Sequence, residues 1–545
     1  MNAPQRLTLA LAQVNLLVGD VQGNLTRALN EAARARAEWG ADLILFPELT
    51  LSGYPPEDLL FHRGLRTQID KAVLDLAAAA PGIGLIVGYP EYAGTQIYNS
   101  AAVFRDGAQL ALTRKSCLPN YRIFDEKRYF TPGTVPAVFE CQGYQLGLLV
   151  CEDIWEPEAA RSARARGAEV LLVINASPYN MNKQREREAV VRERVGECQV
   201  PIVYLNLCGG QDELVFDGNS FVMDASGEVV FRAPAHTMGT YRVQFERQGA
   251  QVVPLPGEVA PEISVEASVY GALVLGVRDY VDKHRFPGVV MGLSGGVDSA
   301  LTLAIAVDAL GPARVQAVMM PSRYTSMMST EDAAVQARTL GVHYSSISIE
   351  GLFESALAAL SAEFAGRAPD ATEENIQARC RGLLLMAISN KSGRMLLTTG
   401  NKSEMAVGYA TLYGDMAGGF AVIKDVFKTF VYRLCHYRNS IAPVIPENII
   451  TRPPSAELKP DQTDQDTLPA YEVLDAIIQA YMEDDRSPRE IIAMGYAAMD
   501  VRRVVDMLKR NEYKRRQAPV GIRITKRGFG KDWRYPITSR YRDEY

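Results

Sequence analysis

Three side chains whose combined chemistry could break an amide bond each follow an apolar, strand-like segment. Glu48, Lys115 and Cys151 all come just after such a segment. Strand ends hold side chains rigidly while leaving them accessible to a substrate. A carboxylate can take the proton of a thiol and so produce the stronger nucleophile. A nearby cation lowers the thiol pKa and stabilises the oxyanion that forms when sulfur attacks an amide carbon.

Each of these residues has an ordinary explanation when it is considered alone. A cysteine after an apolar strand is more often an inert core residue. A single glutamate or lysine at a strand end is usually a solvated cap. The segments that surround the three residues, described below, favour the catalytic interpretation.

A second chemical motif, SGGVDS at 294–299, lies between a short apolar run and an aliphatic segment that is typical of a helix. Strand, glycine turn and helix aim free backbone N–H groups and the positive end of the helix dipole at one point. Glycines let the backbone close around an anion without a Cβ in the way. The expected ligand is therefore a phosphate or pyrophosphate, with Asp298 as a carboxylate for a divalent cation. The alternative is an ordinary glycine-rich turn, and the Gly-Lys-Ser/Thr ending of a Walker A loop is missing.

The segment 398–404 repeats the order of strand, turn and helix start. Thr399 could hydrogen-bond a nucleotide, and Glu404 could share a magnesium ion with Asp298. Mg²⁺ prefers one or two carboxylates, with phosphate oxygens and water completing its octahedron. Considered alone, Glu404 is simply a suitable residue for the first turn of a helix.

Composition places the chain among globular proteins and excludes several classes. A length of 545 residues suggests roughly two to four domains. The net charge of −6 and the lack of a long basic run argue against a nucleic-acid binder. Seven cysteines without CxxC spacing suggest a reducing compartment. The N-terminus is typical of a strand rather than a signal peptide, and no apolar run is long enough to span a membrane, so we expect a cytoplasmic protein.

The order of the predicted elements indicates an α/β fold in two parts. Strand and helix signals alternate through the first half and include hairpin-like pairs. A stretch rich in proline and glycine follows, and it predicts domains at 1–250 and 266–545 with a linker at 251–265. Repeated strand–helix units after the linker predict a doubly wound, mostly parallel sheet, with the glycine turn at its carboxyl edge.

Four segments of the first half resemble the successive signatures of the nitrilase, or carbon–nitrogen hydrolase, superfamily. They are FPEL at 46–49, KSCLPNY at 115–121, FDEKRYF at 124–130 and CEDIW at 151–155. The resemblance implies an α-β-β-α sandwich with Glu48 as general base and Cys151 as nucleophile. It makes Lys115 the group that stabilises the tetrahedral intermediate, and Glu126 a second glutamate that helps to hold the lysine and the leaving amide.

The same resemblance implies a substrate. In the members that use glutamine, contacts with glutamine are expected at the positions of Tyr121, Ser177 and Lys183. The implied products of the first step are a thioester and ammonia, and hydrolysis of the thioester follows.

The second half resembles two nested families. The SGGVDS motif is similar to the pyrophosphate loop of the ATP pyrophosphatase superfamily, whose members split ATP into AMP and pyrophosphate to activate a carboxylate or carbonyl. Further segments narrow the resemblance to the NAD synthetase domain: ENIQAR at 374–379, TGNKSE at 399–404, YGD at 413–415 and EYKRRQ at 512–517. A nitrilase-type module followed by this domain resembles the glutamine-dependent NAD synthetase family over nearly the whole chain.

That resemblance assigns expected ligands to individual residues. Those expected to bind ATP are Gly292, Leu293, Ser294, Gly295, Gly296, Val297, Asp298, Ser299, Thr399 and Lys428. Those expected to face deamido-NAD are Asn375, Glu404, Lys514 and Arg515. Asp298 and Glu404 are the expected magnesium ligands. Lys514 and Arg515 fit an ordinary solvated helix face equally well.

Two further segments carry looser expectations. Arg323 is expected near the adenylate pocket. The acidic stretch with Asp461, Asp464 and Asp466 is either a flexible loop over the site or a solvated loop.

The implied reaction converts deamido-NAD, ATP and glutamine into NAD, AMP, pyrophosphate and glutamate through an adenylated deamido-NAD. Because free ammonia is mostly protonated at neutral pH, we hypothesise a tunnel that joins the two sites. The family also implies a homo-oligomer, either a dimer through the synthetase domain or a larger assembly. Two rivals are another ATP-pyrophosphatase amidotransferase, such as a GMP- or asparagine-type synthetase, and a nucleotide-binding sensor with degenerate sites. The nitrilase signatures disfavour the first rival, and the intact candidate residues disfavour the second.

Overall fold

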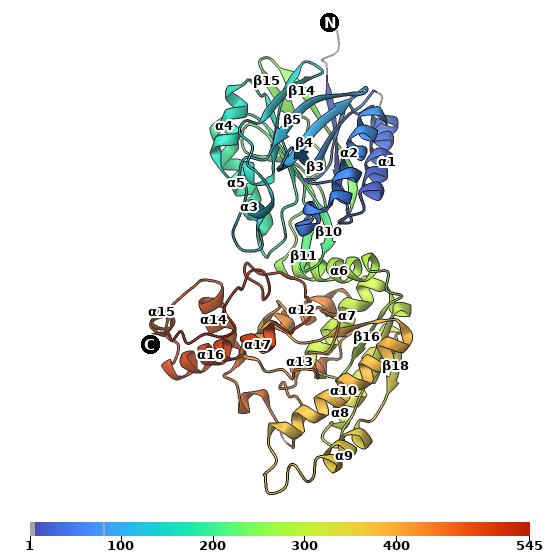
Figure 1. Cartoon of the computed structure of the whole chain (residues 1–545), viewed down its shortest axis with the longest axis vertical. Helices are drawn as coiled ribbons and strands as arrows, with labels where there is room; N and C mark the ends of the chain where they lie inside the picture. The colour runs from blue at the N-terminus through green and yellow to red at the C-terminus, as the bar shows by residue number, and fades with distance from the viewer. Residues whose placement is uncertain (1–5, 80–81, 461) are drawn as a thin grey trace. The chain divides into compact units, whose positions relative to one another are not determined.

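The computed structural model describes residues 6–79, 82–460 and 462–545. The chain divides into two compact units, Met1–Ser264 and Val265–Tyr545 (Figure 1). The segment 251–265, predicted as a linker, contains strand β15 (Gln251–Pro254), which pairs with β14 (Gly239–Gln248). Val252 is buried there, so the first part of this segment belongs to the sheet of the first unit.

The first unit is built on two large sheets and a small hairpin. The seven-stranded sheet has the order β15, β14, β1 (Leu7–Gln13), β2 (Leu43–Leu45), β3 (Gly84–Ala93), β4 (Gln96–Arg105) and β5 (Ala108–Arg114). The six-stranded sheet has the order β13 (Val229–Arg232), β12 (Phe221–Met223), β9 (Ile202–Asn206), β8 (Val170–Asn175), β7 (Tyr144–Val150) and β6 (Ala137–Cys141). The hairpin pairs β10 (Cys208–Gln211) with β11 (Leu214–Asp217).

Helices cover the outer faces of both sheets. They are α1 (Val21–Trp39), α2 (Arg63–Ala79), α3 (Glu126–Tyr129), α4 (Pro157–Ala165) and α5 (Lys183–Cys198), with short 3₁₀ turns η1 (Glu57–Phe61) and η2 (Cys151–Ile154). The α1 and α2 helices lie on one side of the sheets, and α4 and α5 lie on the other (Figure 1). This arrangement confirms the α-β-β-α sandwich.

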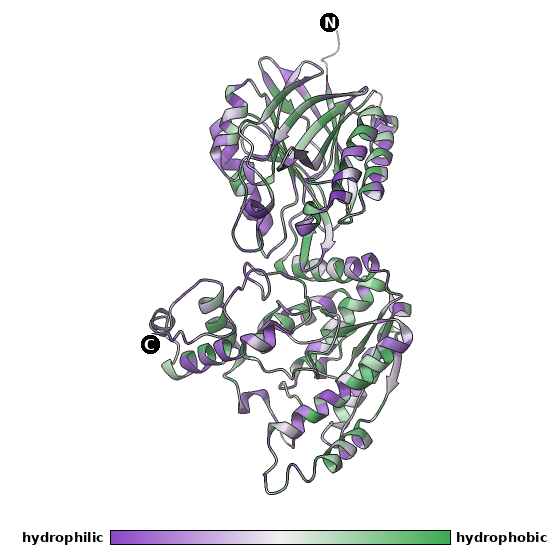
Figure 2. Ribbon diagram, in the orientation of Figure 1, coloured by the Kyte–Doolittle hydropathy of each residue, from purple (hydrophilic) through white to green (hydrophobic). Residues whose placement is uncertain are grey.

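Alternation along the strands explains why two sheets pack face to face. In β1, Leu7, Leu9 and Leu11 enter the core between the sheets, whereas Ala10 and Ala12 face the helices. In α1, Leu25, Ala28 and Ala32 recur at helical spacing and are buried on that same face. Figure 2 shows the strands largely apolar and the outward helix faces hydrophilic.

The second unit is a parallel sheet with helices. The sheet order is β18 (His343–Ser346), β17 (Val315–Met319), β16 (Val289–Gly292), β19 (Met395–Thr398) and β20 (Phe420–Ala421), and every neighbouring pair is parallel. The helices are α6 (Val265–Lys283), α7 (Val297–Leu310), α8 (Met327–Leu340), α9 (Glu350–Ala359), α10 (Ala371–Ser392), α11 (Lys402–Val407), α12 (Lys428–Ile441), α13 (Glu447–Thr451), α14 (Tyr471–Met482), α15 (Pro488–Ala493), α16 (Ala498–Arg510) and α17 (Glu512–Arg515). Short 3₁₀ turns are η3 (Pro312–Arg314) and η4 (Asp464–Asp466).

The central strand β16 places the glycine turn at the carboxyl edge of this sheet. Val290 packs with residues of α9 and α10 on one face, and α7 packs on β16 and β17. Successive strand residues point to opposite faces, so both faces of the sheet are covered. The predicted parallel-sheet domain is therefore confirmed, and its carboxyl edge, where such folds usually bind ligands, is where β16 and β19 end.

Within the described ranges, no helix combines the length and the apolar character that a membrane crossing requires.

Candidate functional site

The first unit holds a buried ammonium between two carboxylates. Lys115 Nζ lies 2.7 Å from Glu48 Oε1 and 2.9 Å from Glu126 Oε1. Lys115 is 1% exposed and Glu48 is fully buried. Glu48 follows β2, Lys115 follows β5, and Glu126 begins α3, so the fold joins three separate segments at one point.

Neighbouring groups that the sequence did not reveal hold this cluster in place. Asn99 donates to Glu48 Oε1 at 2.7 Å, and the backbone N–H of Ala176 donates to Glu48 Oε2 at 3.0 Å. Tyr54 donates through its hydroxyl to Glu126 Oε1 at 3.0 Å. With three donors on the carboxylate of Glu48, its orientation is fixed before a substrate arrives.

The protonation of the cluster reflects burial and mutual charge. Burial alone would lower the pKa of Lys115, but the carboxylates of Glu126 and Glu48 outweigh it and raise that pKa well above its usual range. Burial raises the pKa of Glu126 to about 7, against the opposing effect of Lys115. The lysine is therefore a permanent cation at neutral pH.

Cys151 follows β7 and is the first residue of η2. Its φ of 47° is in the left-handed region, an uncommon conformation for a residue with a Cβ. Asp153 stabilises this turn by accepting from the backbone N–H groups of Ser116 and Cys117, both at 2.9 Å, and of Val150 at 3.1 Å. The same carboxylate thereby ties the nucleophile turn to the segment that begins with Lys115.

The Cys151 side chain is buried next to the charged cluster. Burial raises the pKa of its thiol well above the usual range, Glu48 adds to this increase, and Lys115 opposes it. The thiol is therefore protonated at rest, and a base has to take its proton when sulfur attacks. Glu48 is the carboxylate with the largest influence on that thiol.

Close approach of two backbones lets Glu48 reach the cluster. A Cβ added to Gly88 of β3 would lie 2.4 Å from the backbone nitrogen of Leu49 and 2.9 Å from the carbonyl oxygen of Pro47. Backbone atoms cannot yield as a flexible side chain can, so only glycine fits beside the turn that carries Glu48.

Two of the three residues expected to contact glutamine lie against η2 or the residue that follows it. Tyr121 is about half exposed and donates through its hydroxyl to Glu152 at 2.8 Å, next to Cys151. Lys183 lies 4.0 Å above the ring of Trp155, where burial lowers its pKa. Ser177 is buried after β8, and its N–H donates to Asn206 at 2.9 Å.

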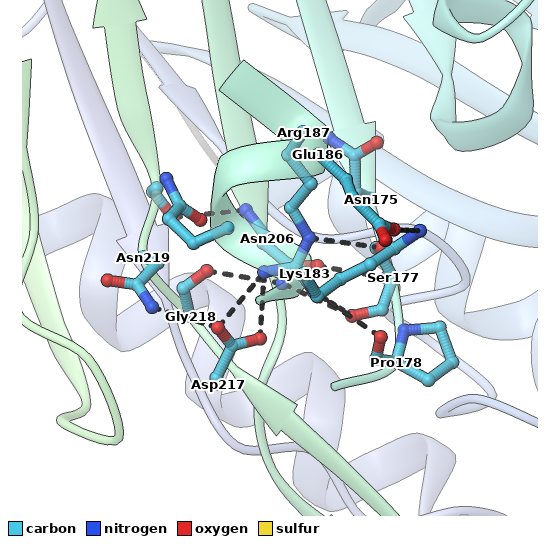
Figure 3. A network of polar contacts seen from close by, with 12 residues as sticks. Asn175, Ser177, Pro178, Lys183, Glu186, Arg187, Asn206, Asp217, Gly218 and Asn219 are labelled. Atoms are coloured by element: carbon cyan, nitrogen blue, oxygen red, sulfur yellow. Dashed lines mark hydrogen bonds and ion pairs between the residues drawn. The ribbon is translucent and has the colours of Figure 1, made fainter. Parts of the chain in front are cut away.

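A buried arginine fixes the position of Ser177. Arg187 of α5 forms two hydrogen bonds with the carboxylate of Asp217, at 2.8 and 3.0 Å (Figure 3). It also donates to the Ser177 carbonyl oxygen at 2.7 Å and to the Ser177 hydroxyl at 3.2 Å. The guanidinium thus connects α5, the end of β11 and the chain after β8. The ion pair of Arg187 with Asp217 could not be predicted from the sequence, because Arg187 is one of several charged residues in α5.

The second unit contains a cavity of about 320 Å³ at the carboxyl edge of its sheet. Seven of the eight glycine-loop residues line it, together with Thr399, Glu404 and Lys428. The remaining one, Gly295, packs on α8 instead: an added Cβ would lie 2.3 Å from the carbonyl oxygen of Ser329. Its φ of 81° is a second reason for glycine at this position.

Hydrogen bonds within the loop fix its shape. Ser299 donates to the carbonyl of Gly296 at 2.9 Å, and the N–H of Gly296 donates to the hydroxyl of Ser294 at 3.2 Å. The helix α7 starts at Val297, so its N-terminus faces the cavity that these residues line. The loop is therefore shaped to receive an anion.

A second shared lysine lies at the wall of this cavity. Lys428 pairs with Asp298 through a short contact and with Glu404 at 3.4 Å. Asn401 donates to Asp298 at 2.9 Å and caps α11, which carries Glu404. Burial, and then the charge of Asp298, raise the pKa of Glu404 to about 8. Because Asp298 and Glu404 both contact Lys428 Nζ, the two carboxylates lie within reach of one common cation.

Three of the residues expected to face deamido-NAD have partners within the chain. Lys514 donates to the carbonyls of Gly408 and Ala410, both at 2.8 Å. Asn375 accepts from the hydroxyl of Thr411 at 2.7 Å. Arg515 is buried and pairs with Glu512 at 2.8 Å.

The structure also describes Arg323 and part of the acidic stretch. Arg323 is about half exposed and forms ion pairs with Glu350 and Glu354 on the surface. Asp464 lines the cavity and accepts from Tyr471 at 2.8 Å, and Asp461 lies outside the described residues.

Both units match known families. The NAD synthase model matches residues 269–518, and the carbon-nitrogen hydrolase model matches residues 8–254. A glutamine-dependent NAD(+) synthetase from Xylella fastidiosa (strain 9a5c) is 49% identical over 540 residues, which cover 98% of this chain and 99% of that relative. The chain belongs to the glutamine-dependent NAD(+) synthetase family.

Other members of the glutamine-dependent NAD(+) synthetase family are also similar to this chain over nearly its full length. One from Thermotoga maritima is 45% identical over 99% of this chain and 100% of its own length. The solved structure of the glutamine-dependent NAD+ synthetase from Acinetobacter baumannii, in complex with adenosine diphosphate, has a TM-score of 0.81 and 46% identity, covering 98% of each chain. The resemblance that the sequence motifs indicated is thus confirmed over the whole length.

The Arg187 pair generates a stability prediction for this family member. Arg187→Met leaves Asp217 buried without its partner, so we expect a loss of roughly 3–5 kcal/mol in the free energy of unfolding. Urea unfolding of the full-length protein measures it. The control is Arg185→Met on the same helix, whose ion pair with Glu262 is exposed. That change should cost at most about 1 kcal/mol, and equal losses in the two variants would contradict the assignment.

Proposed function

We propose that this chain makes NAD by amidating deamido-NAD, with ammonia released from L-glutamine and with ATP as the activating cosubstrate. The observation that carries the proposal is the pairing, in one chain, of a Cys151 site with its Glu48–Lys115 cluster and a cavity enclosed by an anion-binding loop. The names of the relatives support the same overall reaction.

In the first unit, Glu48 takes the thiol proton as Cys151 Sγ attacks the side-chain amide carbon of glutamine. Lys115 stabilises the negative charge that develops on the carbonyl oxygen. The C–N bond then breaks, and ammonia leaves with the proton that Glu48 returns. Water hydrolyses the remaining thioester, with Glu48 again as base, and releases glutamate.

In the second unit, the nicotinate carboxylate of deamido-NAD attacks the α-phosphorus of ATP. The bond from that phosphorus to the bridging oxygen breaks, and its electron pair leaves with pyrophosphate. The loop N–H groups near Ser294 and the α7 N-terminus stabilise the phosphate charge. Ammonia then attacks the activated carbonyl carbon, AMP leaves, and one ammonia proton is lost.

Mg²⁺ fits the donor set of the second unit. Asp298 and Glu404 both contact Lys428 Nζ, so a cation can reach both carboxylates. Among the residues that the structure describes, no group of three or more possible ligands gathers. Two carboxylates suit Mg²⁺, which usually completes its octahedron with phosphate oxygens and water. Bound there, the ion would neutralise charge on the departing pyrophosphate.

The proposal includes passage of ammonia from Cys151 to the adenylate without release into solvent, since protonated ammonia does not attack a carbonyl. It also includes a homo-oligomer. Neither a nucleic acid nor a membrane has a part in the reaction.

Replacing the nucleophile separates the two half-reactions. Cys151→Ala should abolish NAD formation from glutamine, because no other group can form the thioester. Formation driven by added ammonium salt should remain within about twofold of the unchanged protein, because the second unit is intact. Chromatographic quantification of NAD measures both rates. Loss of both activities, or survival of both, would contradict the proposal that Cys151 is the nucleophile that releases ammonia from glutamine.

Replacing Asp298 should stop NAD synthesis with either nitrogen donor and spare glutamine hydrolysis. Asp298→Ala removes a carboxylate that contacts Lys428 and is proposed to hold the metal ion. We expect both glutamine-driven and ammonium-driven synthesis to fall at least 100-fold, while glutamine hydrolysis in the first unit continues. Retained ammonium-driven synthesis would rule out the metal role of Asp298.

The donor to Glu48 has a testable effect on the first half-reaction. Asn99→Leu removes the 2.7 Å hydrogen bond to the proposed base, and hydrogen bonds to charged groups contribute about 1.5–3 kcal/mol. Glutamine hydrolysis should slow by roughly 10-fold to 100-fold, with ammonium-driven synthesis unchanged. The neighbouring Ser100→Ala is the matched control, because Ser100 is equally buried in β4 but donates to Glu91. Similar rates in the two variants would show that Asn99 has no special role.

A further inference from the structure

We propose that Arg452 binds the β- and γ-phosphates of ATP and then the departing pyrophosphate. The inference rests on the proposed function, because it assigns a new residue to the same ATP site. It starts from a guanidinium group that lines the cavity and has an unused donor.

Arg452 is fixed against the anion-binding loop. It follows α13, and its Nη2 donates to the carbonyl oxygen of Gly295 at 2.7 Å. Its backbone N–H donates to Asn448 at 3.1 Å, and Pro453 and Pro454 follow directly. Proline restricts the backbone on both sides of each X-Pro bond, so the arginine is held at one place over the loop.

The other end of the guanidinium has no partner. Within the described part of the chain, Nη1 of Arg452 is buried and makes no hydrogen bond. A buried charged donor without an acceptor is costly, and a ligand that supplies the acceptor recovers that cost. Arg452 also lines the cavity next to the loop, so we infer that a ligand held by the loop supplies the missing acceptor. A planar guanidinium matches phosphate oxygens in geometry and charge.

The charges around the cavity favour such a cation. Lys428 is already paired with Asp298 and Glu404, and Arg381 donates to the carbonyl of Met320 at the end of β17. Asp464 adds a further carboxylate to the lining. A polyphosphate in this acidic environment therefore needs positive charge on the loop side, which Arg452 supplies.

The consequence for the reaction is a more stable leaving group. When the bond from the α-phosphorus to the bridging oxygen breaks, the electron pair and its charge move onto pyrophosphate. Arg452 Nη1 donates to an oxygen of that group, so its effect grows as charge develops. AMP keeps the α-phosphate only and makes no use of Arg452.

The experiment compares nucleotides that differ in their phosphates. For Arg452→Gln, isothermal titration should show ATP binding weakened roughly 10-fold to 100-fold, the range expected for a charge-assisted hydrogen bond. Inhibition by inorganic pyrophosphate should weaken by a similar factor, whereas AMP binding should stay within twofold. The AMP measurement also reports that the variant cavity is intact. Arg452→Lys keeps the charge but not the fork, so it should give intermediate values.

The chain offers a matched control. Arg394 also donates to a backbone carbonyl, that of Ala313 at 3.4 Å, and its Nη1 is likewise buried without a partner among the described residues. Arg394 lies before β19, at the opposite end of that strand from the cavity-lining Thr398 and Thr399. Arg394→Gln should leave the affinities for ATP, pyrophosphate and AMP unchanged.

Two outcomes would overturn the inference: unchanged ATP and pyrophosphate binding in Arg452→Gln, or equal weakening of ATP, pyrophosphate and AMP. The second outcome would mean that Arg452 only supports the cavity. Failure of the proposed function is distinguishable. If the unchanged protein binds ATP but makes no NAD from deamido-NAD, the function is wrong, while selective loss of ATP over AMP in the variant would still assign Arg452 to the phosphates.

Discussion

A buried lysine shared by two carboxylates organises each of the two candidate sites. In the first unit Lys115 lies between Glu48 and Glu126, and in the second Lys428 lies between Asp298 and Glu404. Removing one ion from water costs several kcal/mol, and the lysine and the carboxylates of each cluster offset part of that cost for one another. The carboxylates come from separate segments of the chain, and the shared ammonium ties those segments together. Each cluster has one more acid than base. In the proposed reaction, the additional carboxylate takes a thiol proton in the first unit and helps to hold a metal cation in the second.

Close backbone contact is the second constraint, and both sites meet it with glycine. At Gly88, the turn that carries Glu48 leaves no room for a Cβ. At Gly295, the backbone of α8 leaves no room for one. In both places the atoms that a Cβ would meet belong to the backbone, so the contact cannot be relieved by a side-chain rotation. The glycines therefore set how closely neighbouring segments approach, and this distance decides whether the catalytic groups can touch.

Much of this architecture was predictable, because its signals are local. Alternating apolar residues mark the strands, and the chemical residues follow where those strands end, as with Cys151 and the SGGVDS turn. The supporting groups were not predictable. Asn99 and Arg187 are ordinary polar residues in sequence, and their role depends on which distant partner the fold places opposite them. The start of the linker was also not predictable from the sequence. The pairing of β15 with β14 depends on a sheet edge that exists only in the folded unit.

The basic residues show that charge in the sequence does not reveal which partners a cation has in the fold. Lys514 and Arg515 lie in the most basic stretch near the C-terminus, yet both satisfy backbone carbonyls, and Arg515 also pairs with Glu512. Arg452 lies outside any basic run. Its Nη2 donates to Gly295, whereas its Nη1 has no hydrogen-bond partner among the described residues. A folded protein rarely leaves a buried donor without an acceptor. Arg394 has the same unsatisfied donor within the described ranges, so the proposal for Arg452 depends on its place in the lining of the cavity as well.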